Sequence, residues 1–139
     1  MYQKDYILRM IEMIGDLVAA ILGKIKTGDY KMASDQLSNI YYDILKEDAS
    51  YFKSIPEEDL TFKLLHKHNY SNGHLEILAE LFNAEAELSL AEGNTTGCIE
   101  FSKKALILFK FIDSELKTYT PDRIKKMECL QKRINDLLP

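Results

Sequence analysis

Apolar residues recur at intervals of three and four along most of this 139-residue chain, which is the period of an amphipathic α-helix. No stretch alternates with the period of two that is typical of a half-buried strand. The pattern predicts five long helices, over about residues 2–27, 30–49, 74–92, 95–118 and 121–138, and one short helix over about residues 56–66. We therefore expect an all-α fold in which residues 1–139 form a single domain.

Glycine follows two of these helices and predicts two chain reversals. Gly28 follows the first helix, and Gly93 follows the third long helix, which is expected to end at residue 92. Glycine adopts without strain the left-handed conformation that closes a helix, and a polar residue such as Asp29 is suited to cap the next helix. Each glycine is thus expected to join two antiparallel helices. Residues 68–73 are expected to form a turn.

The apolar positions of the first and last helices indicate which faces are buried. The first helix has a wide apolar stripe that Met13, Ala19 and Ala20 extend, so we expect it to be covered on two sides or to contact a partner. Thr120 is suited to cap the last helix, and Pro121 is suited to its first turn. Its apolar positions, which we expect to be buried, are Ile124, Met127, Leu130, Ile134 and Leu137.

The first turn resembles the tetratricopeptide repeat, a helical-hairpin family. That family reads Gly-x-Tyr-x-x-Ala at the turn, with a bulky residue four positions later and a small residue three positions after that. This chain has Gly28, Tyr30 and Ala33 at the first three positions. Leu37 fits the bulky position, whereas Ile40 stands where a small residue is expected. The resemblance implies a right-handed superhelical stack of antiparallel helix pairs that binds other proteins.

The second turn is a less complete copy of the same pattern. Gly93 and Ala105 match it, and Phe82 and Ala86 fit a bulky and a small position of the preceding helix. The departures are Glu85, Ser89, Thr95, Cys98 and Ser102. The opening segment, residues 2–9 (Tyr-Gln-Lys-Asp-Tyr-Ile-Leu-Arg), is also similar to a group of uncharacterised bacterial proteins of this helical type. That similarity implies a bacterial origin.

Charge is distributed unevenly along the chain, although the net charge is only −4. Residues 57–100 contain 2 basic and 9 acidic groups, a net of −7, and residues 101–139 contain 9 and 5, a net of +4. The two segments either attract each other, within one chain or between two, or are ordinary solvated faces. The last helix is basic, but the sequence pI of about 5.4 argues against nucleic-acid binding. Its cations are Arg123, Lys125, Lys126, Lys132 and Arg133.

The histidines and cysteines do not have the spacing of a metal or redox site. His66 and His68 would lie on nearly opposite sides of a helix, and with His74 they lack the Glu-x-x-His pattern of helical di-iron sites. Cys98 and Cys129 are expected to lie about 16 Å apart along adjacent antiparallel helices, too far for a disulfide. We expect reduced cysteines that pack in the structure, and neither a metal nor a cofactor.

Two further features of the sequence bear on catalysis and phosphate binding: carboxylate pairs and a glycine-containing turn. Glu12 and Asp16, like Glu76 and Glu80, are one helical turn apart, a spacing that is common on helix surfaces. Catalysis by such a pair requires burial or a neighbour that separates the two pKa values. The turn at residues 93–97 lacks the lysine and the preceding strand of a phosphate-binding loop. The sequence therefore predicts no catalytic residues.

The third long helix, over about residues 74–92, offers a candidate groove surface. Glu76, Glu80, Asn83 and Glu87 recur with helical spacing and are expected to line a groove between helix pairs. Their charge favours a basic protein or peptide ligand, and the alternative is a plain solvated surface. We expect a non-enzymatic protein–protein interaction module. The alternative is a small homodimeric helical protein, paired through its first or last helix, with an unrecognised ligand-binding or catalytic site.

Hydropathy argues for a cytoplasmic location. The longest uncharged runs, such as residues 17–23, are far shorter than the roughly 20 apolar residues of a membrane span. Asp5, Glu12 and Asp16 interrupt what would be the apolar part of a signal peptide. We expect neither a membrane anchor nor a secreted protein.

Overall fold

The computed structural model describes residues 2–67, 69–117 and 119–139, and the described residues contain helices but no strand. The all-α prediction is therefore confirmed. The α-helices are α1 (Tyr2–Lys26), α2 (Tyr30–Leu45), α3 (Ala49–Ser54), α4 (Leu60–Phe62), α5 (Asn72–Ala91), α6 (Thr95–Leu116) and α7 (Pro121–Leu137). A 3₁₀-helix, η1 (Glu57–Asp59), precedes α4, and a π-helical turn, η2 (Lys63–Lys67), follows it.

The number of helices differs from the sequence prediction between residues 45 and 67. The second helix ends at Leu45 and does not extend to residue 49, because Lys46 adopts a left-handed conformation with a φ of 62°. The separate helix α3 follows. The single short helix expected over residues 56–66 is replaced by η1, α4 and η2. Five long helices remain, and the described residues contain four short helical segments in place of one.

Both predicted glycine turns are present and have the same hydrogen bonds. Gly28 and Gly93 have φ angles of 83° and 82°. In each turn the amide after the glycine bonds to the carbonyl five residues earlier, Asp29 to Lys24 and Asn94 to Ser89. This is the Schellman arrangement, which satisfies carbonyls at the end of a helix. The side chain of Asp29 makes no capping hydrogen bond, whereas that of Asn94 does.

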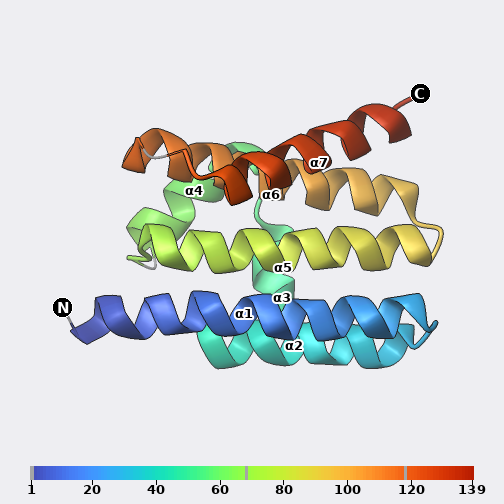
Figure 1. The fold of residues 1–139 in the computed structure, drawn as a ribbon, viewed down its shortest axis with the longest axis horizontal. Coiled ribbons are helices and arrows are strands. Elements are labelled where there is room, and N and C mark those ends of the chain that lie inside the picture. The colour runs from blue at the N-terminus through green and yellow to red at the C-terminus, as the bar shows by residue number, and fades with distance from the viewer. Residues whose placement is uncertain (1, 68, 118) are drawn as a thin grey trace.

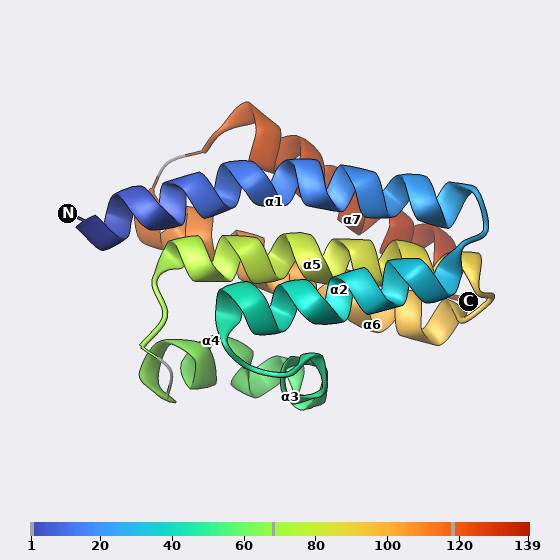
Figure 2. The same cartoon turned by 90° about the horizontal axis from the view of Figure 1, so that it is seen from below.

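The two turns produce two antiparallel hairpins that lie side by side. Helices α1 and α2 form the first hairpin, and α5 and α6 form the second (Figure 1). Helix α5 packs against α6, α1 and α2, and it runs in the same direction as α1 (Figures 1 and 2). The core therefore centres on α5. Its buried apolar side chains are Leu75, Ile77, Leu78, Ala79, Leu81, Phe82, Ala84, Ala86 and Leu88.

The start of α5 is fitted closely against α1. Helix α5 begins at Asn72, inside the segment expected to be a turn. Ser71 and His74 form a reciprocal capping box at its N-terminus. A methyl group added to Gly73 would overlap the Ile7 side chain, so only glycine allows the two helices to approach this closely. The turn residues therefore help to fix the position of α5 against the first hairpin.

The buried faces of α1 and α7 differ from the predicted ones. On α1, Met13 is 49 % exposed and Leu17 is also exposed, although the neighbouring Ile14 and Val18 are buried. On α7, Ile124 is 39 % exposed, whereas Arg123 is only 6 % exposed. The prediction for Ile124 was therefore wrong: at this turn of α7, a cation occupies the buried position. Leu130 and Ile134 are buried as expected, and Met127 and Leu137 are half-buried.

Candidate interaction surface

The four residues predicted to line a groove lie on the side of α5 that faces α7, and each contacts a cation of α7. Glu76 lies 3.6 Å from Arg123, and Glu80 lies 2.6 Å from Lys126. Asn83 accepts a hydrogen bond of 3.0 Å from Arg133, and Glu87 is ion-paired with the same guanidinium. We call this line of contacts the α5–α7 seam. The acidic middle segment and the basic tail thus attract each other within one chain.

Arg123 anchors the N-terminal end of α7. Its Nε donates to Asp113 of α6, and its NH1 faces Glu76 of α5. Arg123 and Asp113 are both buried. Since a buried charge without a partner is costly, the two carboxylates are what allow a cation to occupy this position. Sequence reasoning missed this pair, because Asp113 and Arg123 belong to different helices and each resembles an ordinary surface charge.

Arg133 makes the second set of contacts, about three helical turns further along α7. Besides Asn83 and Glu87 of α5, it reaches the Ser102 hydroxyl of α6 at 3.4 Å. Ser102 is fully buried. In the sequence, Ser102 stood out only as a departure from the tetratricopeptide-repeat pattern. Here it is a polar group in the region where three helices meet.

Burial and pairing act in opposite directions on the ionisable groups of the seam. Burial raises the pKa of Glu76, and the nearby cations Arg123 and Lys126 offset only part of that rise. For Lys126, burial lowers the pKa, but Glu80 and Asp122 outweigh it, so that the pKa is raised. Lys126 is therefore fully charged at neutral pH, and its interaction with Glu80 is an ion pair.

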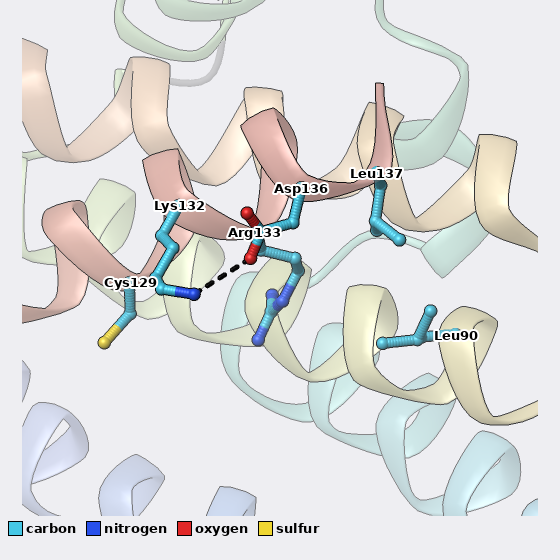
Figure 3. Close-up of a pocket in the computed structure, with 6 residues that line it drawn as sticks. All are labelled: Leu90, Cys129, Lys132, Arg133, Asp136 and Leu137. Carbon is cyan, nitrogen blue, oxygen red and sulfur yellow. Dashed lines mark hydrogen bonds and ion pairs between the residues drawn. The ribbon is translucent and has the colours of Figure 1, made fainter. Parts of the chain in front are cut away.

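Two cavities follow the seam and leave it incompletely packed. One, of about 400 Å³, lies between α5 and α7, where Glu80, Asn83 and Glu87 face Lys126 and Arg133. The other, of about 320 Å³, lies at the C-terminal end of α7 (Figure 3). Leu90 of α5 and Leu137 of α7 both line it, and Lys132 and Asp136 form an ion pair of 3.0 Å beside it.

A larger cavity of about 570 Å³ lies between the first half of α1, the start of α5 and the end of α6. It has apolar walls, including Ile7 and Ile112, and a polar side that includes His74. Burial lowers the pKa of His74. Its Nδ1 accepts a hydrogen bond of 3.0 Å from the backbone amide of Ser71. His74 therefore caps a helix, and its Nδ1 is already used in this bond.

The remaining candidate residues are the histidines and the cysteines. His66 is exposed, and the prediction for His68 lies outside the described residues. Within residues 2–67, 69–117 and 119–139, no three His, Cys, Asp or Glu side chains are grouped as metal ligands would be. Cys98 and Cys129 are both free, as predicted. Cys98 is buried, as expected of a packing cysteine, whereas Cys129 is exposed, so the prediction that it packs in the structure was wrong. Burial raises the pKa of the Cys98 thiol, which makes it less reactive.

A second charged cluster attaches α3 to the second hairpin and was not found from the sequence. Lys53 of α3 forms an ion pair of 2.7 Å with Glu85 of α5, which is buried. Lys104 of α6 donates to the Lys53 carbonyl at 2.9 Å. Both lysines also lie over aromatic rings, Phe101 and Phe82 respectively. These contacts hold the connecting segment in place.

Comparison of the chain with protein-family models, curated proteins and solved structures gives no match. Among the described residues, every helix is too short or too polar to cross a membrane.

Proposed function

We propose that this protein is a non-enzymatic protein–protein interaction module that binds a basic helical segment of a partner. The single observation that carries the proposal is the α5–α7 seam, where Glu80, Asn83 and Glu87 hold the cations of a basic helix. The same side chains that hold α7 have the chemistry to hold a similar helix from another protein. The right-handed tetratricopeptide-like stack belongs to this proposal, and the two matching glycine turns support it.

The physical advantage of such a site is that its acidic side is already formed. Glu80, Asn83 and Glu87 are fixed on the central helix of the core, so little conformational entropy is lost when a ligand binds. Helix-in-groove binding uses apolar anchors at helical spacing, with charges on either side. The carboxylates of α5 would attract cations and repel an acidic or C-terminal carboxylate ligand.

The test is a binding titration with synthetic helical peptides of equal length and apolar pattern that carry either Lys and Arg or Glu and Asp. We expect only the basic peptides to bind, and we expect the affinity to fall as salt is raised. A basic peptide in which one Arg that faces α5 is replaced by Gln should bind about tenfold more weakly, in line with the loss of one charged hydrogen bond. The same replacement at an outward-facing position of the peptide is the matched control and should leave the affinity unchanged. Equal binding of basic and acidic peptides would refute the proposal.

A homodimer is the second candidate, and one observation favours it. Tyr6, Met13 and Leu17 are exposed and follow one side of α1. The last helix is a weaker candidate for dimerisation, since Leu130 and Ile134 of α7 are already buried within the chain. Light scattering separates the two candidates, because only the homodimer requires a mass twice that of the chain.

A further inference from the structure

The contacts of α7 change in character along its length. At its N-terminal end, Arg123 and Asp113 form a buried ion pair. Further along, each ion pair has one partly exposed member: Lys126 is 38 % exposed against 10 % for Glu80, and Glu87 is 37 % exposed against 17 % for Arg133. An ion pair with a partly exposed member is weaker and more sensitive to salt than one in which both members are buried. The two ends of α7 are therefore held with different strength.

Apolar packing beneath the C-terminal half of α7 is also limited. In this half, only Leu130 and Ile134 are buried, and Leu138 is exposed. The open pocket of about 320 Å³ lies along this half, and the one of about 400 Å³ follows α7 from Asp122 to Arg133. Side chains at an open pocket have solvent on one side and therefore make fewer dispersion contacts than in close packing. The end of α7 also diverges from α6 (Figure 1), and Figure 3 shows the open space between Leu90 and Leu137.

We propose that the α5–α7 seam is an exchange site: a basic amphipathic helix of a partner displaces residues 126–137 of α7, while Arg123 keeps the first turn of α7 attached. This inference rests on the proposed function and goes further, because it identifies α7 as the resident occupant of the site. The site is thus blocked in the free protein by a segment that has the chemistry of its ligand.

The contacts of α7 define the partner. Lys126 and Arg133 place cations at positions i and i+7, and Leu130 and Ile134 place apolar side chains at i+4 and i+8. A partner helix with this pattern replaces each ion pair that it breaks, so exchange has a small electrostatic cost. A larger apolar side chain in place of Leu137 would fill the space near Leu90 and favour the partner over α7.

The experiment uses the full-length protein and a fluorescent synthetic peptide of residues 119–139. Arg133→Gln in the protein weakens the resident α7 by removing its contacts with Asn83 and Glu87. Lys132→Gln is the matched control, because Lys132 lies on the same helix and, within the described part of the chain, pairs with Asp136, one turn away. Circular dichroism checks that both variants keep their helix content.

We expect the Arg133→Gln protein to bind the peptide about tenfold more tightly than the Lys132→Gln protein, because α7 competes less for the site. A peptide with both Lys126→Glu and Arg133→Glu should not bind. Hydrogen exchange should become faster over residues 126–137 when the peptide binds, and should stay unchanged over residues 121–124. These results together would support exchange.

Peptide binding that leaves hydrogen exchange over residues 126–137 unchanged would overturn the exchange of α7, while leaving open the proposed interaction at another surface. If the α7 peptide exchanges but none of the unrelated basic helices binds, the exchange site stands and the proposed function fails. A stable dimer in light scattering with α7 protected would also overturn the inference, because the occupant would then be α7 of a second copy.

Discussion

Arg123 is the residue on which the position of α7 depends most directly. Its guanidinium lies between Asp113 and Glu76 and so joins three helices at one buried point. A cation is stable there only because carboxylates from α6 and α5 surround it. Ile124, its neighbour, faces outward as a consequence, since successive helical positions point about 100° apart. One buried ion pair thus sets which face of α7 is turned toward the core.

The close contact of Gly73 with α1 leads to a test at a single residue. Gly73→Ala should gain up to about 1 kcal/mol of helix propensity but lose more, because the new methyl overlaps Ile7. We expect a net destabilisation of about 1–3 kcal/mol in urea unfolding, the usual range for overpacking. Gly23→Ala is the matched control, since a methyl there meets nothing within 4 Å, and it should stabilise the protein by roughly 0.5–1 kcal/mol. Equal effects at both positions would contradict the close α1–α5 contact.

At the scale of elements, most helix limits follow local signals, and the exceptions have specific causes. The ends at Gly28 and Gly93 and the start at Pro121 were predicted, because glycine and proline restrict the backbone without help from tertiary contacts. The end of α2 at Lys46 was missed, since lysine rarely adopts a left-handed conformation. Tertiary contacts fix that end: the Tyr70 hydroxyl donates to the carbonyl of Leu45.

The capping box of α5 predicts a pH dependence. Burial lowers the pKa of His74, and protonation of Nδ1 would break its bond to the Ser71 amide. This contribution to stability is complete above the unfolded pKa of about 6.5 and is lost as pH falls below it. His74→Gln keeps a side chain suited to this capping position but cannot titrate. We expect the Tm of the unmodified protein to fall relative to that of His74→Gln between pH 7.5 and 5; parallel curves would contradict this.

At the scale of the whole molecule, charge organises the second half of the chain. The segment with a net charge of −7 supplies α5, and the segment with a net charge of +4 supplies α7. Three cations of α7 pair with carboxylates of α5 along the seam. Raising salt should therefore act mainly on α7, since the hairpins are held by apolar packing.

The oligomeric state of the protein is a further prediction at this scale. Three of the exposed apolar side chains of α1, Tyr6, Met13 and Leu17, form one narrow row. A stable interface usually buries about 800 Å² on each partner, more than such a row supplies. We therefore expect a monomer in sedimentation equilibrium at micromolar concentrations. A dimer that Met13→Glu dissociates would instead support the homodimer hypothesis and place its interface on α1.

The sequence by itself determined the helical class, the two glycine turns and most long-helix limits, because these depend on periodicity and local backbone preference. It also pointed to Glu76, Glu80, Asn83 and Glu87 as one face of a helix. Only the tertiary structure decided what that face meets, since the cations that pair with it lie about 40–50 residues further along the chain. The same holds for the buried Arg123 and for the pairing of Lys53 with Glu85. A surface charge and a buried, paired charge have the same local sequence, and only the approach of other helices distinguishes them.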